Sequence, residues 1–350
     1  MSQILQTVDN ITDPVILELV MPYYHEILDL ETIKRNNGLK KEPRVMFLKN
    51  FGIQSSGTMA LILFNLPAIF FLLTKKIKKE VEFIYIRSNL FLPLAFSAYL
   101  LRVPIFLEIH RNPLSFGESI RDKAMSRIVT GMIVISDYLR VHYLSYGKKI
   151  LVAHDAVSLE RFGRTLGKEE ARKKLGLALK KKISVYAGTV RKLKGVDYLV
   201  EAAKRLPEVD FLLVGPVSEE FQNQSFPSNI KLLGKKDQED IPSLLQAADV
   251  LLLPHPKSEY SQSPMKLFEY MASGVPIVAS RLPSISEVLN DRNAILVEAE
   301  NGKALANGIA KAINDIKLSQ TLAQQAYNDV QNYTWEKRGI AIAEFIKENI

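Results

Sequence analysis

Short apolar runs alternate with helical stretches along most of this chain, and this alternation constrains the fold more than any other feature. The first series of apolar runs covers residues 44–48, 82–86, 105–109, 132–135 and 150–153. The second series covers residues 183–187, 211–214, 230–233, 250–253, 277–279 and 294–297. Helical periodicity separates most of these runs, which is typical of a parallel sheet covered by helices on both faces. We therefore expect an α/β fold with two Rossmann-like, doubly wound parallel sheets.

A change in composition marks the boundary between the two expected domains. Residues 158–182 are rich in Gly, Lys and Arg, and the segment ends in three consecutive lysines. We expect an amino-terminal domain at residues 1–162 and a second domain at residues 163–334, because 350 residues are enough for two ordinary cores. Residues 335–350 are predicted to form a final helix.

The composition excludes several classes of function. The chain has no cysteine, so it has neither disulfides nor thiolate metal sites, and its five histidines show no ligand spacing. We expect no metal site and no cofactor. There is no Gly-x-Gly-x-x-Gly motif and no P-loop, which argues against a dinucleotide dehydrogenase and a P-loop NTPase. The net charge of +8 suits phosphorylated substrates or an anionic membrane, and without an aromatic-studded basic groove we do not expect nucleic-acid binding.

One apolar stretch raises the question of a membrane. Residues 59–73 are apolar apart from interruptions such as Asn65 and Pro67, and four lysines follow within residues 75–79. A membrane span takes about 20 residues, so the stretch is too short to cross a bilayer. It is either a buried core helix with a basic end or a helix that lies on an anionic membrane surface. Residues 1–14 lack the features of a signal peptide, so we expect a cytoplasmic protein, with peripheral contact at the inner face of the cell membrane left open.

The segment from Ser263 to Pro276 predicts a short helix that begins at the carboxyl end of a strand. Ser263 is a good N-cap, Pro264 suits the first turn, and Gly274 suits the left-handed residue after the last turn. Such a helix start offers free N–H groups to phosphate, and Lys266 adds a positive charge there. Glu269 follows three residues later on the same side. The segment therefore predicts a site for the diphosphate and ribose of a nucleotide.

Residues 186–195 form a second candidate for phosphate binding. A strand ends at Gly188, a loop with Arg191 and Lys194 follows, and a helix is expected to begin near Val196. Arg binds phosphate oxygens as a fork and Lys binds them as a point charge. A solvated basic loop explains the same residues equally well.

Two histidines close predicted strands, at the edge where α/β sheets collect their active sites. His110 follows the strand at residues 105–109, and His255 follows the strand at residues 250–253. Glu108 lies on the same face of the strand as His110 and can orient it. A lone histidine is more often structural, so position alone does not assign a role to either residue.

Taken together, these motifs resemble family 4 of the retaining glycosyltransferases, which have the GT-B fold. The resemblance covers roughly residues 80–350 and follows the family's order of strands and helices. It is carried in the second half by residues 186–188, 194–202, 211–215, 248–254 and 266–276, and in the first half by residues 85–88, 104–110 and 134–136. It implies two domains that face a cleft, with the helix from Trp335 crossing back to the amino-terminal domain.

The resemblance implies a role for each matching residue. Glu269 matches the carboxylate that holds the donor ribose, Lys194 the lysine that neutralises the leaving diphosphate, and His110 a histidine that contacts the donor sugar near the reacting carbon. The expected catalytic residues are His110, Lys194, Lys266 and Glu269. The expected donor-binding residues are Gly188, Thr189, Arg191, Lys194, Ser263, Met265, Lys266, Leu267 and Glu269.

The chain departs from the family pattern at three places. Ser261 stands where many relatives carry a first glutamate near the donor sugar, and Glu259 is two residues away. Thr189 stands at the usual position of an arginine, although Arg191 is close. The family's first glycine-rich loop has only the segment at residues 52–57 as a counterpart.

The resemblance implies a metal-independent, retaining glycosyltransferase that acts on hexoses or related sugars. Its donor would be a nucleoside diphosphate sugar, and its acceptor a glycan or a lipid-linked molecule in the synthesis of surface polysaccharide or glycolipid. Two alternatives remain open: a non-catalytic partner subunit, which the departures at Ser261 and Thr189 favour, and a sugar-nucleotide epimerase with the same fold. The sequence specifies neither the base, the sugar, the acceptor nor the oligomeric state.

Overall fold

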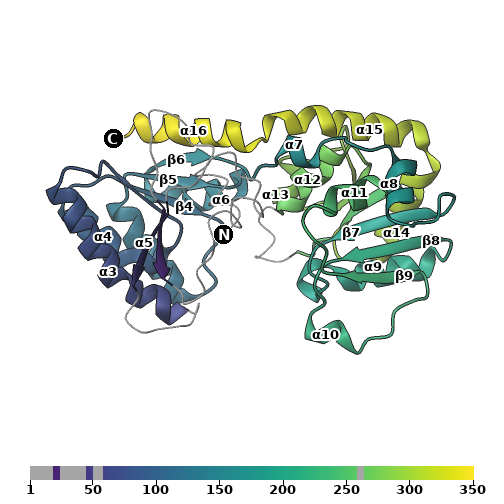
Figure 1. Cartoon of the computed structure of the whole chain (residues 1–350), viewed down its shortest axis with the longest axis horizontal. Helices are drawn as coiled ribbons and strands as arrows, with labels where there is room; N and C mark the ends of the chain where they lie inside the picture. Colours follow the sequence, from purple (N-terminus) through teal and green to yellow (C-terminus); the bar gives the residue numbers. More distant parts are fainter. Residues whose placement is uncertain (1–18, 24–44, 50–57, 258–263) are drawn as a thin grey trace. The chain divides into compact units, whose positions relative to one another are not determined.

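The chain divides into two compact units, which are described one at a time (Figure 1). The computed structural model describes residues 19–23, 45–49, 58–257 and 264–350. The first unit comprises Met1–His154 and Trp335–Ile350, and the second comprises Asp155–Thr334, so the division falls after His154 where the sequence suggested residue 162. Ser263, Ser261, Glu259 and the glycine-containing segment at residues 52–57 lie outside the described residues.

The first unit is built on a parallel sheet in which neighbouring strands follow each other in the chain. The sheet order is β3-β4-β5-β6, and a separate parallel pair is formed by β1 and β2. The strands are β1 (Leu19–Tyr23), β2 (Val45–Lys49), β3 (Ile84–Ile86), β4 (Ile105–Ile109), β5 (Gly131–Val134) and β6 (Lys149–Val152). All four strands of the larger sheet lie within two residues of the predicted ranges, because continuous apolar runs mark strands buried on both faces.

Helices cover both faces of this sheet. The helices are α3 (Thr58–Ile77), α4 (Leu92–Leu100), α5 (Phe116–Ile128), α6 (Asp137–Tyr143) and α16 (Trp335–Lys347), with short 3-10 helices η1 (Asn89–Phe91) and η2 (Leu144–Tyr146). On one face, residues of α3 to α6 pack against Leu107 and Ile109. On the other face, Ile342 and Ile346 of α16 pack against Phe106. The expected return of the final helix to the amino-terminal domain is confirmed.

The second unit has the strand order of a doubly wound sheet. Its parallel strands are ordered β12-β11-β10-β7-β8-β9, so the chain builds outward from β7 in one direction and from β10 in the other. The strands are β7 (Lys182–Ala187), β8 (Val209–Val214), β9 (Ile230–Gly234), β10 (Val250–Leu253), β11 (Ile277–Ser280) and β12 (Ile295–Val297). The predicted doubly wound architecture is confirmed for this unit.

Two apolar cores lie on the two faces of the second sheet. Alternate strand residues contribute to opposite cores, with Val185 on one face and Tyr186 on the other, as the two-residue period of a strand requires. The helices are α7 (Leu159–Phe162), α8 (Lys168–Lys174), α9 (Val196–Arg205), α10 (Glu219–Gln222), α11 (Ile241–Gln246), α12 (Met265–Ser273), α13 (Pro283–Ser286), α14 (Gly302–Asn314) and α15 (Ile316–Asp329), with 3-10 helices η3 (Lys192–Lys194) and η4 (Val330–Asn332). Helices α9 and α14 cover one face, and α11 and α12 cover the other.

No helix in the described parts of the chain has both the length and the apolar character that crossing a membrane requires.

Candidate active site

The strand order of the second unit creates a crevice between the loops that follow β7 and β10. These two strands are hydrogen-bonded neighbours, with Val250 opposite Ser184 and Leu251 opposite Val185. The chain leaves β7 toward α9 on one face and leaves β10 toward α12 on the other face. Ligands of open α/β sheets bind at such a switch point, outside the carboxyl ends of the strands. Both of the predicted phosphate-binding segments lie there.

The loop after β7 is held against the end of β10 by a glycine. Gly195 has φ of +77°, a left-handed conformation that side chains rarely adopt, and a Cβ atom at this position would collide with the carbonyl oxygen of Pro254. This close approach places Lys194 beside the residue that follows Pro254. The Nζ atom of Lys194 lies 3.4 Å from Nε2 of His255.

Three nitrogen-bearing side chains gather at this point, and no carboxylate among the described residues pairs with them. His255 is only 4% exposed, and burial, together with the charge of Lys194, lowers the pKa of its imidazole to about 3. Burial and the positive charge of Arg191 lower the pKa of Lys194. In the described part of the chain, neither Arg191 nor Lys194 forms a salt bridge. Both Nδ1 of His255 and Nε of Arg191 are buried without a hydrogen-bond partner there. A buried group of this kind is costly unless a ligand satisfies it, so the cluster of Arg191, Lys194 and His255 favours an anion.

Helix α12 starts one residue later than its sequence suggests. Pro264 is the N-cap and has an extended backbone, and its carbonyl accepts a hydrogen bond from the amide of Leu267 at 2.9 Å. Pro264 therefore precedes the helix instead of occupying its first turn. Gly274 ends the helix with φ of +68°, as predicted.

The side chains of α12 divide between the core and the crevice. Leu267 is buried, and the hydroxyl of buried Tyr270 accepts a hydrogen bond from the amide of Ala187 at 2.8 Å, which fixes α12 to the end of β7. The amides of Met265 and Lys266 are the first two of the helix, which by helix geometry lack intrahelical acceptors. Met265 is half-buried.

Lys266 and Glu269 lie on the same side of α12, and they form an ion pair with each other. Nζ of Lys266 is 2.6 Å from Oε2 of Glu269. Arg161 of α7 is a further cation near this carboxylate, since Glu269 partly offsets the burial that lowers the pKa of Arg161. The expected contacts of Lys266 and Glu269 with phosphate and ribose stay a prediction.

Gly188 and Thr189 form the start of the loop after β7. The amide of Gly188 donates to Val214 at 2.8 Å, and the hydroxyl of Tyr186 donates to the carbonyl of Thr189 at 2.9 Å. Thr189 is half-buried, and Arg191 follows it closely enough to act electrostatically on both Lys194 and Tyr186. Among the predicted donor-binding residues, the second unit thus brings Gly188, Thr189, Arg191 and Lys194 together in one loop.

His110 belongs to the first unit, where it is held in a buried polar network. Its Nε2 atom lies 2.6 Å from Oε1 of Glu108, whose side chain is fully buried at the end of β4. Nη2 of Arg338, from α16, contacts the same oxygen at 2.8 Å. Burial alone would raise the pKa of Glu108, but Arg338 and His110 hold it below its ordinary value. Glu108 therefore stays ionised and orients His110, which is partly exposed.

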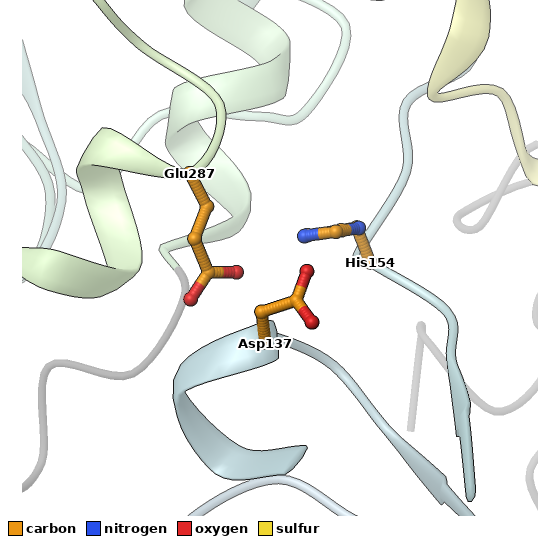
Figure 2. A group of neighbouring side chains, drawn as sticks. All are labelled: Asp137, His154 and Glu287. Atoms are coloured by element: carbon orange, nitrogen blue, oxygen red, sulfur yellow. The ribbon is translucent and has the colours of Figure 1, made fainter. Parts of the chain in front are cut away.

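Figure 2 shows a second group of polar side chains, to which no role was assigned from the sequence. Asp137 at the start of α6 and His154 after β6 have ligand-type atoms within 4.8 Å of each other, and both belong to the first unit. Asp137 already pairs with Arg140 at 2.6 Å. Glu287, also drawn there, belongs to the second unit. We assign no metal to these residues, and the absence of a metal from the reaction remains a prediction.

Sequence reasoning missed several residues of the candidate site. The sequence indicates His255 only as a histidine at the end of a strand, which by itself assigns it no part in donor binding. Tyr270 and Arg161 reach the site through tertiary contacts that no local pattern signals. The signal that identifies His255 is its position directly after Pro254, the residue that touches Gly195.

Comparison with known proteins agrees with this geometry. Residues 167–329 match the family model "Glycosyl transferases group 1". The D-inositol 3-phosphate glycosyltransferase of Corynebacterium urealyticum is 24% identical over 261 residues, which cover 68% of this chain and 61% of that protein. The matches cover about half to three fifths of the length of the first such relatives.

Solved structures of glycosyltransferases share the fold over most of the chain. HepE of Anabaena, solved in complex with UDP and glucose, superposes with a TM-score of 0.74 at 19% identity, covering 98% of this chain and 94% of that one. Sucrose-phosphate synthase from Thermosynechococcus elongatus superposes with a TM-score of 0.73 at 20% identity, covering 88% and 83%. The two parallel-sheet units therefore define a protein of the GT-B class. Residues 167–329, which lie in the second unit, are in addition similar to the group 1 glycosyltransferases.

Proposed function

We propose that this chain transfers a sugar from a nucleoside diphosphate sugar to a glycan or lipid-linked acceptor. The observation that carries the proposal is the cluster of half-buried Arg191, half-buried Lys194 and buried His255 at the switch point of a doubly wound sheet, where no carboxylate of the described residues pairs with it. A diphosphate supplies the negative charge and the hydrogen-bond acceptors that this cluster lacks. UDP is the first nucleotide to test, because HepE was solved with UDP.

In the proposed reaction, the bond from the sugar's anomeric carbon to the diphosphate oxygen breaks, and an acceptor hydroxyl oxygen bonds to that carbon. The proton of the hydroxyl passes to the departing phosphate. Negative charge develops on the β-phosphate in the transition state, and Lys194, Arg191 and Lys266 stabilise it with the first amides of α12. Glu269 holds the ribose, and His110, oriented by Glu108, contacts the sugar.

We further propose that the anomeric configuration is retained and that no metal takes part. Cationic side chains supply the charge that a divalent ion would otherwise give to the leaving diphosphate. Departure and attack on the same face of the sugar account for retention. Surface polysaccharide or glycolipid synthesis at the cytoplasmic side of the cell membrane remains a prediction.

The test is the release of UDP by the purified full chain from a panel of UDP-sugars, with and without glycan acceptors. The whole proposal is supported if the sugar is transferred, if NMR of the product shows a retained anomeric configuration, and if EDTA does not change the rate of transfer. Arg191→Ala and Lys194→Ala should each lower turnover by about 100-fold, the usual cost of losing one transition-state donor.

Two observations favour a second candidate, a non-catalytic partner subunit. Thr189 stands where the family carries an arginine, and the ion pair of Lys266 and Glu269 occupies both side chains without a ligand. Nucleotide binding without turnover of any donor would support this candidate. Release of free UDP without an acceptor, together with an epimerised sugar, would instead indicate a sugar-nucleotide epimerase.

A further inference from the structure

The outward face of α3 carries a continuous line of exposed apolar side chains. Ile62, Leu66, Phe70, Leu73 and Ile77 recur every three or four residues, and all five are exposed, Phe70 by 71% and Ile77 by 81%. This period places them on one side of the helix, over about 22 Å of its length. The opposite side of the helix is apolar as well, and it is buried in the first unit.

Helix α4 extends this apolar face. Its exposed residues Phe96, Tyr99 and Leu100 lie opposite the buried Ala95 and Ala98. Buried Asn65 joins the two helices, because its side-chain amide donates to the carbonyl of Leu90 at 3.1 Å and its oxygen accepts from the amide of Leu94 at 3.2 Å. Figure 1 shows α3 and α4 side by side in the first unit. The apolar surface consists of Ile62, Leu66, Phe70, Leu73, Ile77, Phe96, Tyr99 and Leu100.

Positive charge lies at one end of the apolar surface. Each of the two helices leads directly into a strand of the same parallel sheet, so both end at the same sheet edge. Lys76 and Lys78 flank Ile77, Lys79 follows, and Arg102 comes just after Leu100. Within the described residues, none of these four cations pairs with a carboxylate. Two acidic residues lie nearby: Glu80 pairs with Lys75, and Glu82 is exposed.

We propose that the apolar surface docks flat on an anionic lipid bilayer, with its basic end against the headgroups. An exposed apolar patch on a monomer marks an interaction surface. Apolar side chains enter the boundary between headgroups and acyl chains, and lysines bind the lipid phosphates. The four cations at the basic end favour an anionic membrane over a neutral partner, because they attract negatively charged headgroups. This surface is separate from the donor site of the second unit, so it does not depend on the proposed function.

Vesicle flotation of the full chain tests the proposal, with vesicles of phosphatidylcholine alone or with about one third phosphatidylglycerol. We expect the chain to float with the anionic vesicles only. Phe70→Glu together with Ile77→Glu should abolish flotation, whereas Leu232→Glu with Ile316→Glu, which changes exposed apolar residues of the second unit, should not. All four side chains are exposed, so the variants should keep the melting temperature of the parent chain.

The contribution of charge is tested with a matched pair of triple variants. Changing Lys76, Lys78 and Lys79 to Gln should weaken vesicle partitioning by about 100-fold, since each lysine near an anionic surface contributes about fivefold. The same change at the exposed residues Lys303, Lys311 and Lys317 of the second unit removes the same charge and should leave partitioning nearly unchanged.

Three outcomes would overturn the proposal. The first is a parent chain that stays at the bottom of the gradient with anionic vesicles. The second is a loss of flotation in the control variants that equals the loss in the variants of the apolar surface. The third is a dimer in sedimentation velocity that Phe70→Glu with Ile77→Glu dissociates, which would assign the surface to a second copy of the chain. The melting-temperature shift caused by UDP should be the same in every variant. A failure of nucleotide binding is therefore distinguished from a failure of membrane docking.

Discussion

Replacing Lys194 by methionine should weaken nucleotide binding without destabilising the ligand-free protein. In the ligand-free chain the ammonium is partly buried beside His255 and near Arg191, and no carboxylate pairs with it in the described residues. A hydrogen bond from a charged group contributes about 1.5–3 kcal/mol, so its loss should raise the Kd for UDP by about 10- to 150-fold. Methionine keeps most of the volume and removes the uncompensated charge.

The same variant should change the pH dependence of stability. The pKa of Lys194 is lowered in the folded state, so protonation costs folding free energy at every pH below the folded pKa. That cost is relieved as the pH rises from the folded pKa toward the ordinary value of 10.5. The parent chain should therefore gain stability relative to Lys194→Met over this alkaline range.

Calorimetric titration with UDP and thermal unfolding from pH 6 to 10 measure both effects. The control is Lys192→Met, which removes an exposed lysine from the same 3-10 helix and should change neither quantity. Unaltered UDP affinity in Lys194→Met, or a fall in its melting temperature without ligand, would refute the reasoning.

Three further predictions concern other buried polar groups. His255→Leu should reduce the loss of stability between pH 6.5 and 3 by roughly 4 kcal/mol, measured by urea unfolding. The reason is that the pKa of His255 is about 3 in the folded protein, so over this range the unfolded chain binds a proton that the folded chain does not. The same substitution at exposed His142 is the control and should leave this loss unchanged. Tyr270→Phe should cost about 1–3 kcal/mol in the same assay, because a buried amide of β7 loses its acceptor. Glu108→Gln should cost about 3–5 kcal/mol by leaving the buried guanidinium of Arg338 uncompensated, and Glu108→Gln with Arg338→Met should recover part of this loss.

The positions of the strands could be predicted from the sequence because parallel strands buried on both faces are continuous apolar runs. The predicted ranges 105–109 and 250–253 coincide with β4 and β10, and the helix from Val196 begins where its sequence indicates. Helix ends are less certain from sequence. The start of α12 is set by the extended backbone of Pro264, which composition alone does not reveal.

The candidate site was predictable only as far as its segments are local. The loop at residues 188–195 and the helix after β10 each have a local signature, and the strand order brings them to one crevice. The role of His255 depends on the contact between Gly195 and Pro254, which are distant in sequence. Likewise, one partner of Glu108 is Arg338, more than 200 residues further along, so no spacing in the sequence indicates that ion pair.

A crystal structure of the chain with UDP is the most direct test of the central claim, that the second unit binds a diphosphate at its switch point. The account predicts the β-phosphate within hydrogen-bonding distance of Lys194 Nζ and of the first amides of α12, with the Lys266–Glu269 ion pair opened. A diphosphate bound elsewhere on the chain, with the cluster of Arg191, Lys194 and His255 unchanged, would contradict it.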